Sequence, residues 1–307
     1  MSNEKQDFKE LSDLSKSYLL DRAAHAGALD VAKALLEAGA DPNYSRKDIN
    51  AARPLQTAFK NGDLPMVNLL MEHGASTKAN FHGSQIENCM KENSNYKELI
   101  KAVFEKEPDQ FQVGHAINHC AKNGDAEFLD YLFTKDFSIT TRMTAMTYAC
   151  RLGHTNVVQK LHENEFVIRL DDIVNAACNG HFETTEKILK ISMFDQDELN
   201  DAMISTYRRT NDYDKVNVFL QAGANPNTDN DDLFNRCSND NNQTFIERLI
   251  VQHRYKPSET TMQGLQFAND DFSSHVKNLL KKLELNEKLN QKHQPRQVKT
   301  KSLTMKI

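Results

Sequence analysis

The sequence predicts an all-α solenoid in which eight or nine helix-turn-helix repeats stack side by side. The first observation is a recurring pair, a small residue followed four positions later by Gly, which is typical of the end of a helix. The second is the interval of 27 to 35 residues between these pairs, which indicates a repeat array. The third is residues 23–43, which predict two helices whose one apolar stripe has nothing within the segment to cover it. Such a repeat is stable only when it stacks on similar neighbours.

The Gly of this pair locates the repeats along the chain. Clear copies end at Gly27, Gly62, Gly124, Gly153 and Gly180, and degenerate copies carry Asn93, Asn211, Asn241 or Asp271 instead. Since Asn and Asp tolerate the left-handed conformation, we expect them to end helices in the same way. The predicted repeats occupy residues 15–43, 53–76, 79–108, 113–140, 142–169, 170–195, 197–227, 231–258 and 260–282.

Local signals support helices in the first three repeats. The second helix of the first repeat is predicted from apolar residues at helical spacing, Leu29, Ala32, Leu35 and Leu36. Pro42 follows in a polar exit loop. In the second repeat, Asp63 is placed to cap the second helix and Pro65 lies just inside it. The third repeat lacks the Gly and ends at Pro108.

The later repeats are less regular. The fourth to sixth have short exit loops, the seventh regains the longer exit, and the eighth is rich in Asn and Asp. The ninth is predicted from an apolar stripe, Val276, Leu279, Leu280 and Leu283, with lysines on its other face. A terminal repeat needs such a polar outer face because no further neighbour covers it.

The two ends of the chain differ in charge from the array. Residues 1–14 are polar and predict a capping segment, and residues 283–307 predict a basic, disordered tail. Nine of the 38 Lys and Arg lie in residues 277–307, with only two of the 43 Asp and Glu, so the preceding array is acidic. The first ten residues lack the apolar run of a signal peptide, and no stretch approaches a membrane span. We therefore expect a cytoplasmic protein.

Cysteine usage indicates a reducing compartment. The chain has five cysteines, an odd number, and none forms a Cys-x-x-Cys pair: Cys89, Cys120, Cys150, Cys178 and Cys237. Three of them stand in the small-residue region of a first helix, where a thiol acts as a compact apolar group. We expect them to be buried and reduced.

The second repeat resembles the ankyrin repeat. Residues 53–58 read Arg-Pro-Leu-Gln-Thr-Ala, residues 61–63 read Asn-Gly-Asp, and residues 66–75 read Met-Val-Asn-Leu-Leu-Met-Glu-His-Gly-Ala. The family opens its first helix with Thr-Pro-Leu-His-x-Ala and ends its second with Leu-Leu-x-x-Gly-Ala. The exit loops at 39–43 and 223–227 resemble that of the family too, as do the Gly-His pairs at 153–154 and 180–181.

This resemblance covers residues 15–282 and is most complete at residues 18–43 and 53–76. It implies stacked helical hairpins that bind a protein partner through their concave face, without catalysis. No repeat keeps both the Thr and the His of the opening motif, and Arg53 and Gln56 stand in their places in the second repeat. The resemblance therefore also implies some irregularity in the array.

Basic residues recur two positions before the Gly, Asn or Asp that ends each first helix. The equivalent residues are His25, Lys60, Lys91, Lys122, Arg151, Cys178, Arg209 and Asn239. In an ankyrin-like stack they would form a line beside the inner surface. Such a line favours an acidic or phosphorylated segment of a protein, or an anionic lipid headgroup. The alternative is that these are ordinary solvent-facing cations that complement the helix dipole.

Two further sets of residues are candidates for partner binding. The residues five positions before the helix-ending Gly, in the first helix of each repeat, vary in type, as residues that recognise a partner would: Arg22, Thr57, His119, Tyr148 and Asn175. The predicted loop tips offer Tyr44, Arg46, Asp48, Phe81 and His82. An exposed aromatic such as Tyr44, Phe81 or Tyr148 could anchor a partner, or could instead pack on its own neighbouring hairpin.

Catalytic signals are absent from the sequence. His115 and His119 lie one helical turn apart beside Cys120, which is formally compatible with a metal site, but the spacing is common and no carboxylate stands at a characteristic offset. There is no phosphate-binding Gly-rich loop, nucleophile elbow or His-Glu-x-x-His motif. We expect a non-catalytic protein without metal or cofactor.

The function predicted is protein binding through the concave face of the array. One interpretation is a secreted effector of an intracellular bacterium, delivered by a non-classical system, because the flexible polar C-terminus resembles the export signals of ankyrin-repeat effectors. The other is a scaffold or adaptor within its own cell. A third possibility is binding of an anionic membrane or nucleic acid by the basic tail. The tail lacks aromatics and a long amphipathic stripe, which argues against nucleic acid as the partner.

Overall fold

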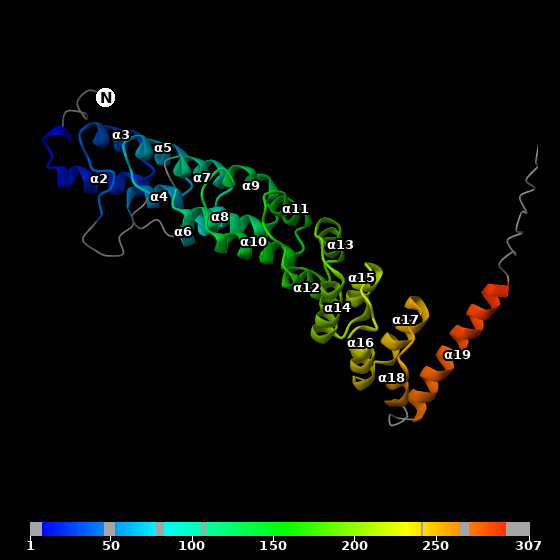
Figure 1. The fold of residues 1–307 in the computed structure, drawn as a ribbon. Helices are drawn as coiled ribbons and strands as arrows, with labels where there is room; N and C mark the ends of the chain where they lie inside the picture. Colours follow the sequence, from blue (N-terminus) through cyan, green and yellow to red (C-terminus); the bar gives the residue numbers. More distant parts are fainter. Residues whose placement is uncertain are drawn as a thin grey trace, which may run out of the picture. The chain divides into compact units, whose positions relative to one another are not determined.

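The described part of the chain is helical throughout. The computed structural model describes residues 8–45, 53–77, 83–105, 108–240, 242–264 and 270–292, and these contain no strand (Figure 1). The chain divides into two compact units, Met1–Asp172 and Ile173–Ile307, called here the N-terminal and C-terminal units. The predicted all-α fold is confirmed.

The N-terminal unit is a two-layered stack of helical hairpins. After a short turn, η1 (Phe8–Glu10), the helix pairs are α2 (Asp13–Ala26) with α3 (Leu29–Glu37), α4 (Pro54–Lys60) with α5 (Leu64–Glu72), α6 (Gly83–Glu92) with α7 (Tyr96–Phe104), α8 (Gln110–Asn123) with α9 (Ala126–Leu132), and α10 (Ile139–Leu152) with α11 (Thr155–Glu163). Figure 1 shows the first helices of these pairs in one layer and the second helices in the other. Consecutive first helices contact one another from α2 to α10.

The C-terminal unit repeats the pattern with shorter and more variable helices. Helix α12 (Leu170–Cys178) crosses the boundary between the units. The helices that follow are α13 (Phe182–Ile191), α14 (Gln196–Thr210), α15 (Tyr213–Gln221), α16 (Thr228–Asn239), α17 (Gln243–His253), α18 (Glu259–Gly264) and α19 (Asp270–Lys292). The described residues thus contain nine consecutive helix pairs, the upper of the two predicted numbers.

A hydrogen bond joins the small residue of the predicted pair to the residue that follows the Gly. Gly27 has a φ of 65°, and the N–H of Ala28 after it donates to the carbonyl of Ala23 at 2.9 Å. The same bond closes α4, α8, α10 and α12, with donor–acceptor distances of 2.9 to 3.1 Å. This is the Schellman ending of a helix, which requires a left-handed residue at the Gly position. The predicted helix ends are therefore confirmed at all five clear copies.

The degenerate copies behave differently from one another. Asn211 has a φ of 48° and ends α14 in the left-handed conformation, as predicted. The prediction is wrong at Asn93, which is not among the positive-φ residues and instead donates from its side chain to the Cys89 carbonyl at 3.3 Å. It is also wrong at Asp271, which lies inside α19. Asn241 lies outside the described residues.

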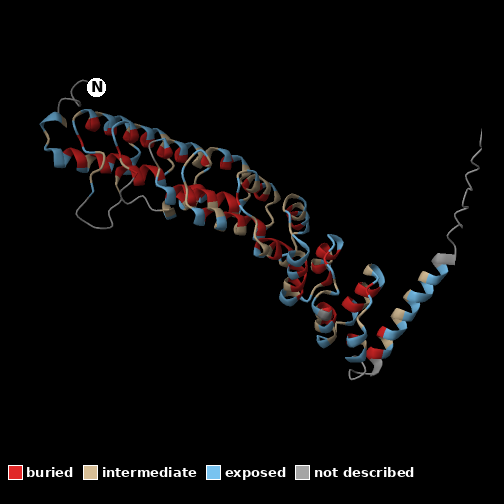
Figure 2. Cartoon of the chain, viewed as in Figure 1, coloured by how far each residue is buried: buried red, intermediate tan, exposed pale blue. Residues whose placement is uncertain are grey.

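The core lies between the two layers. Figure 2 shows the buried residues of the N-terminal unit concentrated along the surfaces where helices face one another. Within the stripe predicted for α3, Ala32, Leu35 and Leu36 are buried, but Leu29 is 37% exposed because it is the first residue of the helix. Burial of such apolar side chains against the next hairpin is what holds a solenoid together.

Four of the first helices share a hydrogen bond that satisfies the backbone N–H of their N-cap residue. Oε1 of Gln56, in the first turn of α4, accepts the N–H of Arg53 at 2.8 Å. The equivalent bond recurs three residues into α8, α12 and α14, where Gln112, Asp172 and Glu198 accept from the N-cap residue. This is one half of a capping box. In the second repeat, Arg53 and Gln56 form this bond in the places of the Thr and His that open the ankyrin repeat.

The last helix is longer than predicted. Helix α19 continues to Lys292, past the predicted end of the array at residue 282. Val276 is fully buried, whereas Leu285 and Leu289 are each 52% exposed. The extension is rich in Leu, Lys and Glu, which favour helix, and Glu287 pairs with Lys256 at 2.9 Å. Residues 293–307, which carry the rest of the predicted tail and export signal, lie outside the described residues.

Among the described helices, none is both long enough and apolar enough to cross a membrane.

Candidate functional site

A row of basic residues runs along the first-helix layer of the N-terminal unit. The last turns of α2, α4, α6, α8 and α10 each carry one: His25, Lys60, Lys91, Lys122 and Arg151. Because these helices contact one another in sequence, the five residues form a continuous series, called here the basic row. Lys122 is half-buried and the other four are exposed. The positions are therefore equivalent in space as well as in sequence.

Glu87 provides a negative charge at the middle of the basic row. Its Oε1 lies 2.9 Å from Nδ1 of His115 and 4.0 Å from Nζ of Lys122, and its Oε2 lies 4.0 Å from Nζ of Lys91. Partial burial alone would raise the pKa of Glu87. The hydrogen bond with His115 and the charges of Lys122, His115 and Lys91 together hold this pKa below its ordinary value. Glu87 is therefore ionised at neutral pH and offsets one positive charge.

Tyr148 lies between the last two cations of the basic row. Nζ of Lys122 is 4.5 Å from the centre of its ring, and the guanidinium carbon of Arg151 is 5.5 Å from it. A cation at these distances is attracted by the ring face. Tyr148 is half-buried. It thus packs on residues of its own chain, one of the two alternatives considered from the sequence, and it fixes where these two cations stand.

The histidine pair beside Cys120 has separate structural roles. His115 is engaged by Glu87, whereas His119 is only 7% exposed. Burial lowers the pKa of His119. Nearby charges act more weakly: Glu87 raises this pKa, whereas Lys91 and Lys122 lower it. Cys120 is fully buried, and burial raises the pKa of its thiol far above the usual range. Among the described residues, no three potential metal ligands gather into a group.

The remaining predicted residues are scattered. Arg22 is exposed on α2, and Tyr44, in the loop after α3, is half-buried. Arg209 is exposed in the last turn of α14, in the C-terminal unit, and donates to Oδ1 of Asn175 at 3.2 Å. Arg46 and Phe81 lie outside the described residues, as do Asp48 and His82. The basic row is therefore the one predicted set whose described members the fold brings together.

A hollow opens beside the start of the basic row, between α4 and α6. It has a volume of about 200 Å³. Its lining consists of His25, Gln56, Thr57, Phe59, Lys60, Asn61, Gln85, Asn88 and Cys89. Phe59 and Cys89 are fully buried and apolar, whereas the rest of the lining is polar or positively charged. The hollow is called here the α4–α6 pocket.

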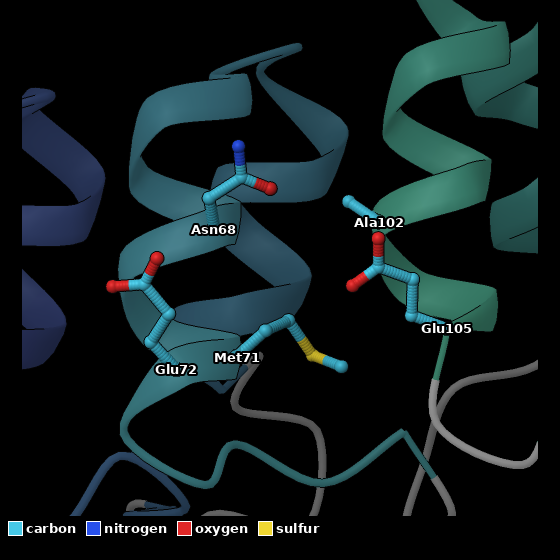
Figure 3. A pocket seen from close by; sticks show the side chains of 5 residues that line it. All are labelled: Asn68, Met71, Glu72, Ala102 and Glu105. Atoms are coloured by element: carbon cyan, nitrogen blue, oxygen red, sulfur yellow. The ribbon is translucent and has the colours of Figure 1, made fainter.

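A second hollow lies on the opposite layer, between α5 and α7. Its volume is about 320 Å³, and it is lined by Asn68, Met71, Glu72, Ala102 and Glu105. Figure 3 shows the Met71 side chain pointing toward α7, while the carboxylate of Glu72 points away from that helix. Both carboxylates are exposed, and no buried polar atom of this lining lacks a partner. Its groups therefore do not converge on a common point, and we assign it no role.

Sequence reasoning missed the acidic and amide groups around the basic row. These groups belong to α6: Gln85, Glu87 and Asn88. Helix α6 is the first helix of the third repeat, which lacks the helix-ending Gly, so the sequence did not locate this helix precisely. Glu87 stands four residues before Lys91, a spacing that puts both on one helical face. That spacing was the available signal.

Comparison with known proteins gives a family match for the first two hairpins. Residues 20–71 match the family model described as ankyrin repeats in many copies. No curated protein matches the chain. Among solved structures, the chain is similar to the crystal structure of the human ASB11 ankyrin repeat domain, with 17% identity and a TM-score of 0.33 over 67% of this chain and 84% of that chain.

Proposed function

We propose that the chain is a non-catalytic ankyrin-repeat module that binds a protein partner through the first-helix layer of its N-terminal unit. Residues 20–71 match the ankyrin-repeat model, and further helical hairpins follow them. Repeat arrays use such extended surfaces for binding because each repeat adds one more equivalent position. The partner segment would be acidic or phosphorylated.

The observation that carries this proposal is the basic row. Lys91 and Lys122 share one carboxylate, Glu87, so the three residues together keep a positive charge within an array that is acidic as a whole. A local field of opposite sign to the rest of the molecule steers an acidic partner to one face. The half-buried Tyr148 holds Lys122 and Arg151 in place and so limits the entropy that a partner would lose in ordering them.

Matched charge reversals test the proposal. Partners are captured from a lysate with the wild-type chain, and the dissociation constant of the purified partner is then measured against two double variants. Lys60→Glu with Lys91→Glu reverses the basic row, whereas Lys33→Glu with Lys101→Glu makes the same charge change at exposed residues of α3 and α7.

We expect the first variant to bind at least about tenfold more weakly, because two attractive pairs become repulsive, and the second to bind within about twofold of wild type. The loss should shrink as salt is raised, since exposed charges are screened. Equal effects of the two variants would remove the basic row as the binding surface.

The cellular setting stays a prediction. The surface would serve equally an effector delivered into a host cell or an adaptor in the cell that makes it. A translocation reporter fused to the full chain separates these, because only an effector produces signal inside the recipient cell. Binding of an anionic membrane by the basic tail likewise stays a prediction, and vesicles containing phosphatidylserine test it against a chain that ends at residue 282.

A further inference from the structure

The α4–α6 pocket is lined by two residues that each have a buried polar atom without a hydrogen-bond partner. The basic row alone does not explain them. We propose that it receives the carboxylate of one Asp or Glu side chain from the partner segment. This inference rests on the proposed function, because it assumes that a protein segment lies along the first-helix layer. It adds to that function a defined subsite and the chemical identity of the side chain that enters it.

The first observation is the hydroxyl of Thr57. Its side chain is 4% exposed, and Oγ1 is buried without a hydrogen-bond partner. Helical Thr residues commonly donate to the carbonyl one turn earlier, and four other described Thr residues do so: Thr144, Thr147, Thr185 and Thr210. Thr57 does not, and neither does Thr206 of α14, but of these two only Thr57 lines the pocket. Its hydroxyl is therefore a buried donor without a partner in a residue that lines the pocket.

The second observation is Gln85 on the facing helix. Its Oε1 is also buried without a partner, and it lines the same pocket from α6. A carboxamide can turn so that either its oxygen or its NH₂ group faces a ligand. Two helices thus each contribute one residue with a buried, unsatisfied polar group to the lining of the same pocket. Buried polar groups in folded proteins are nearly always hydrogen-bonded, so such a pair indicates a missing partner.

The charge of the pocket selects an anion. Lys60 and His25 are exposed members of its lining, and none of its nine lining residues is Asp or Glu. Asn61 and Asn88 add exposed amide groups. No arginine lines the pocket, whereas phosphorylated motifs are typically recognised by arginine clusters. One lysine with neutral hydroxyl and amide donors suits a carboxylate, which accepts several hydrogen bonds and carries a single charge.

The size of the pocket indicates a side chain rather than a free metabolite. Its volume of about 200 Å³ is below the range of roughly 300–1,000 Å³ in which proteins enclose small ligands. The apolar floor formed by Phe59 and Cys89 would pack against the methylene groups of the entering side chain. An Asp or Glu within a longer peptide fits both limits, because the rest of its affinity comes from the basic row.

A peptide selection tests the proposal without knowledge of the natural partner. A random peptide display library is selected on the immobilised full chain, and enriched peptides are synthesised with a fluorescent label for anisotropy measurements. We expect one position to be Asp or Glu in the enriched set. Exchange of that residue for Asn or Gln should weaken binding to wild type by about tenfold, or about 1.4 kcal/mol.

Variants of the pocket locate the contact. Lys60→Met, Thr57→Val and Gln85→Met each keep the size of the side chain and remove its charge or polar group, and Lys33→Met on α3 is the matched control. The peptide exchange and a pocket variant should be non-additive, because both remove the same contact. Additive losses, or a phosphoserine peptide that binds more tightly than its Glu counterpart, would overturn the assignment to a carboxylate.

Stability measurements separate a ligand from a buried water molecule. If the pocket awaits a partner, Thr57→Val and Gln85→Met should leave the unfolding midpoint of the free chain unchanged or raise it, because an unsatisfied polar group is removed. If a water molecule already satisfies these groups, the same variants should lower the midpoint and leave peptide affinity unchanged. That second outcome would overturn the proposal.

The failure of this inference is distinguishable from failure of the proposed function. Enriched peptides that lose affinity with Lys91→Glu or Arg151→Glu, but not with any pocket variant, would keep the binding surface and remove the subsite. A selection that enriches no peptide against the first-helix layer would count against both.

Discussion

Gly62 is a residue at which a single methyl group should disturb two hairpins. Its φ is 72°, and a Cβ atom there would overlap Oδ1 of Asn93 in the next repeat. We expect Gly62→Ala to lower the free energy of unfolding by about 2 kcal/mol or more, from left-handed strain together with the clash. Urea denaturation followed by circular dichroism measures this.

Gly74 provides the matched control for this change. It also has a positive φ, of 87°, but a Cβ atom there would meet nothing within 4 Å. Gly74→Ala should therefore cost only the strain, about 1 kcal/mol. Equal losses at the two sites would show that Asn93 moves aside freely and that the clash contributes nothing.

His119 should make the N-terminal unit sensitive to mild acid. Burial lowers its pKa in the folded state below the ordinary value of 6.5. Its contribution to stability is therefore complete above about pH 6.5 and is lost as pH falls below that value toward the folded-state pKa, because the unfolded chain binds the proton first. His119→Gln should flatten the dependence of unfolding free energy on pH between about pH 7 and 5.

The control for this prediction is His162, a half-buried histidine in the last turn of α11. His162→Gln makes the same exchange on another helix of the same unit and so controls for the substitution itself. An unaltered slope in His119→Gln would mean that the acid sensitivity of the unit comes from other groups.

Residue-level chemistry was only partly predictable from the sequence. The row from His25 to Arg151 could be found because each member stands at a fixed offset from a Gly whose conformation is dictated by backbone sterics. The pocket could not, because a Thr within a helix ordinarily bonds its own backbone. That Thr57 and Thr206 do not is a property of the packing around their helices and leaves no mark on the sequence.

At the scale of one element, the start of α14 has a complete capping box. Oδ1 of Asp195 accepts the N–H of Glu198 at 2.9 Å, and Oε2 of Glu198 accepts the N–H of Asp195 at 3.0 Å. Asp195→Ala should therefore destabilise the C-terminal unit by about 1 kcal/mol. Glu198→Gln should cost less than Glu198→Ala, since an amide oxygen can still accept the bond.

Asp197 separates capping from electrostatics in this experiment. It is an exposed acid in the same first turn and interacts with the same helix dipole. Asp197→Ala should cost no more than a few tenths of a kcal/mol, as measured by chemical denaturation. A loss as large as that of Asp195→Ala would mean that charge, and not the hydrogen bonds, supports the start of α14.

Element boundaries were predictable where one residue controls the backbone. Gly124 and Gly153 end α8 and α10 where expected, since few other residues adopt their conformation. Asn93 misled the prediction because its side chain has a second way to satisfy the end of a helix. The extent of α19 was missed because helix propensity, not a packing pattern, carries it to Lys292.

For the molecule as a whole, cohesion is strictly local. Every substantial contact between described helices joins elements no more than two apart in chain order. Across one such joint, Nδ2 of Asn43 donates to the Gly74 carbonyl at 3.0 Å, and its Oδ1 accepts the N–H of Ser76 at 2.7 Å. Stability in such an array is a sum of repeat terms and neighbour terms, so damage should remain near its origin.

Hydrogen exchange tests this expectation with Asn43→Ala. Exchange should accelerate in α2 and α3, whose joint to the next hairpin loses two hydrogen bonds of about 1 kcal/mol each, and should remain unchanged in α14 to α17. Asn123→Ala is the control, because the Asn123 amide donates to the His119 carbonyl of its own helix and not across a joint between the described hairpins. Acceleration throughout the chain would show that the array unfolds as one cooperative body.

The repeat architecture was the most predictable feature of all, because a spacing that recurs along the whole array can be recognised even where one repeat lacks its helix-ending Gly. The third repeat was found without its Gly, and its helices α6 and α7 are present. The division at residue 172 was not predicted, since it falls inside α12 and no composition change accompanies it.

The joint at Asn43 has a consequence for how such a chain can change over generations. Both groups that it bonds, the Gly74 carbonyl and the Ser76 N–H, belong to the main chain, which any substituted neighbour would still provide. A hairpin could therefore be duplicated, deleted or exchanged by recombination without a matching set of side chains on the receiving side. The array can alter its length and its recognition surface by whole modules, while each module diverges on its own.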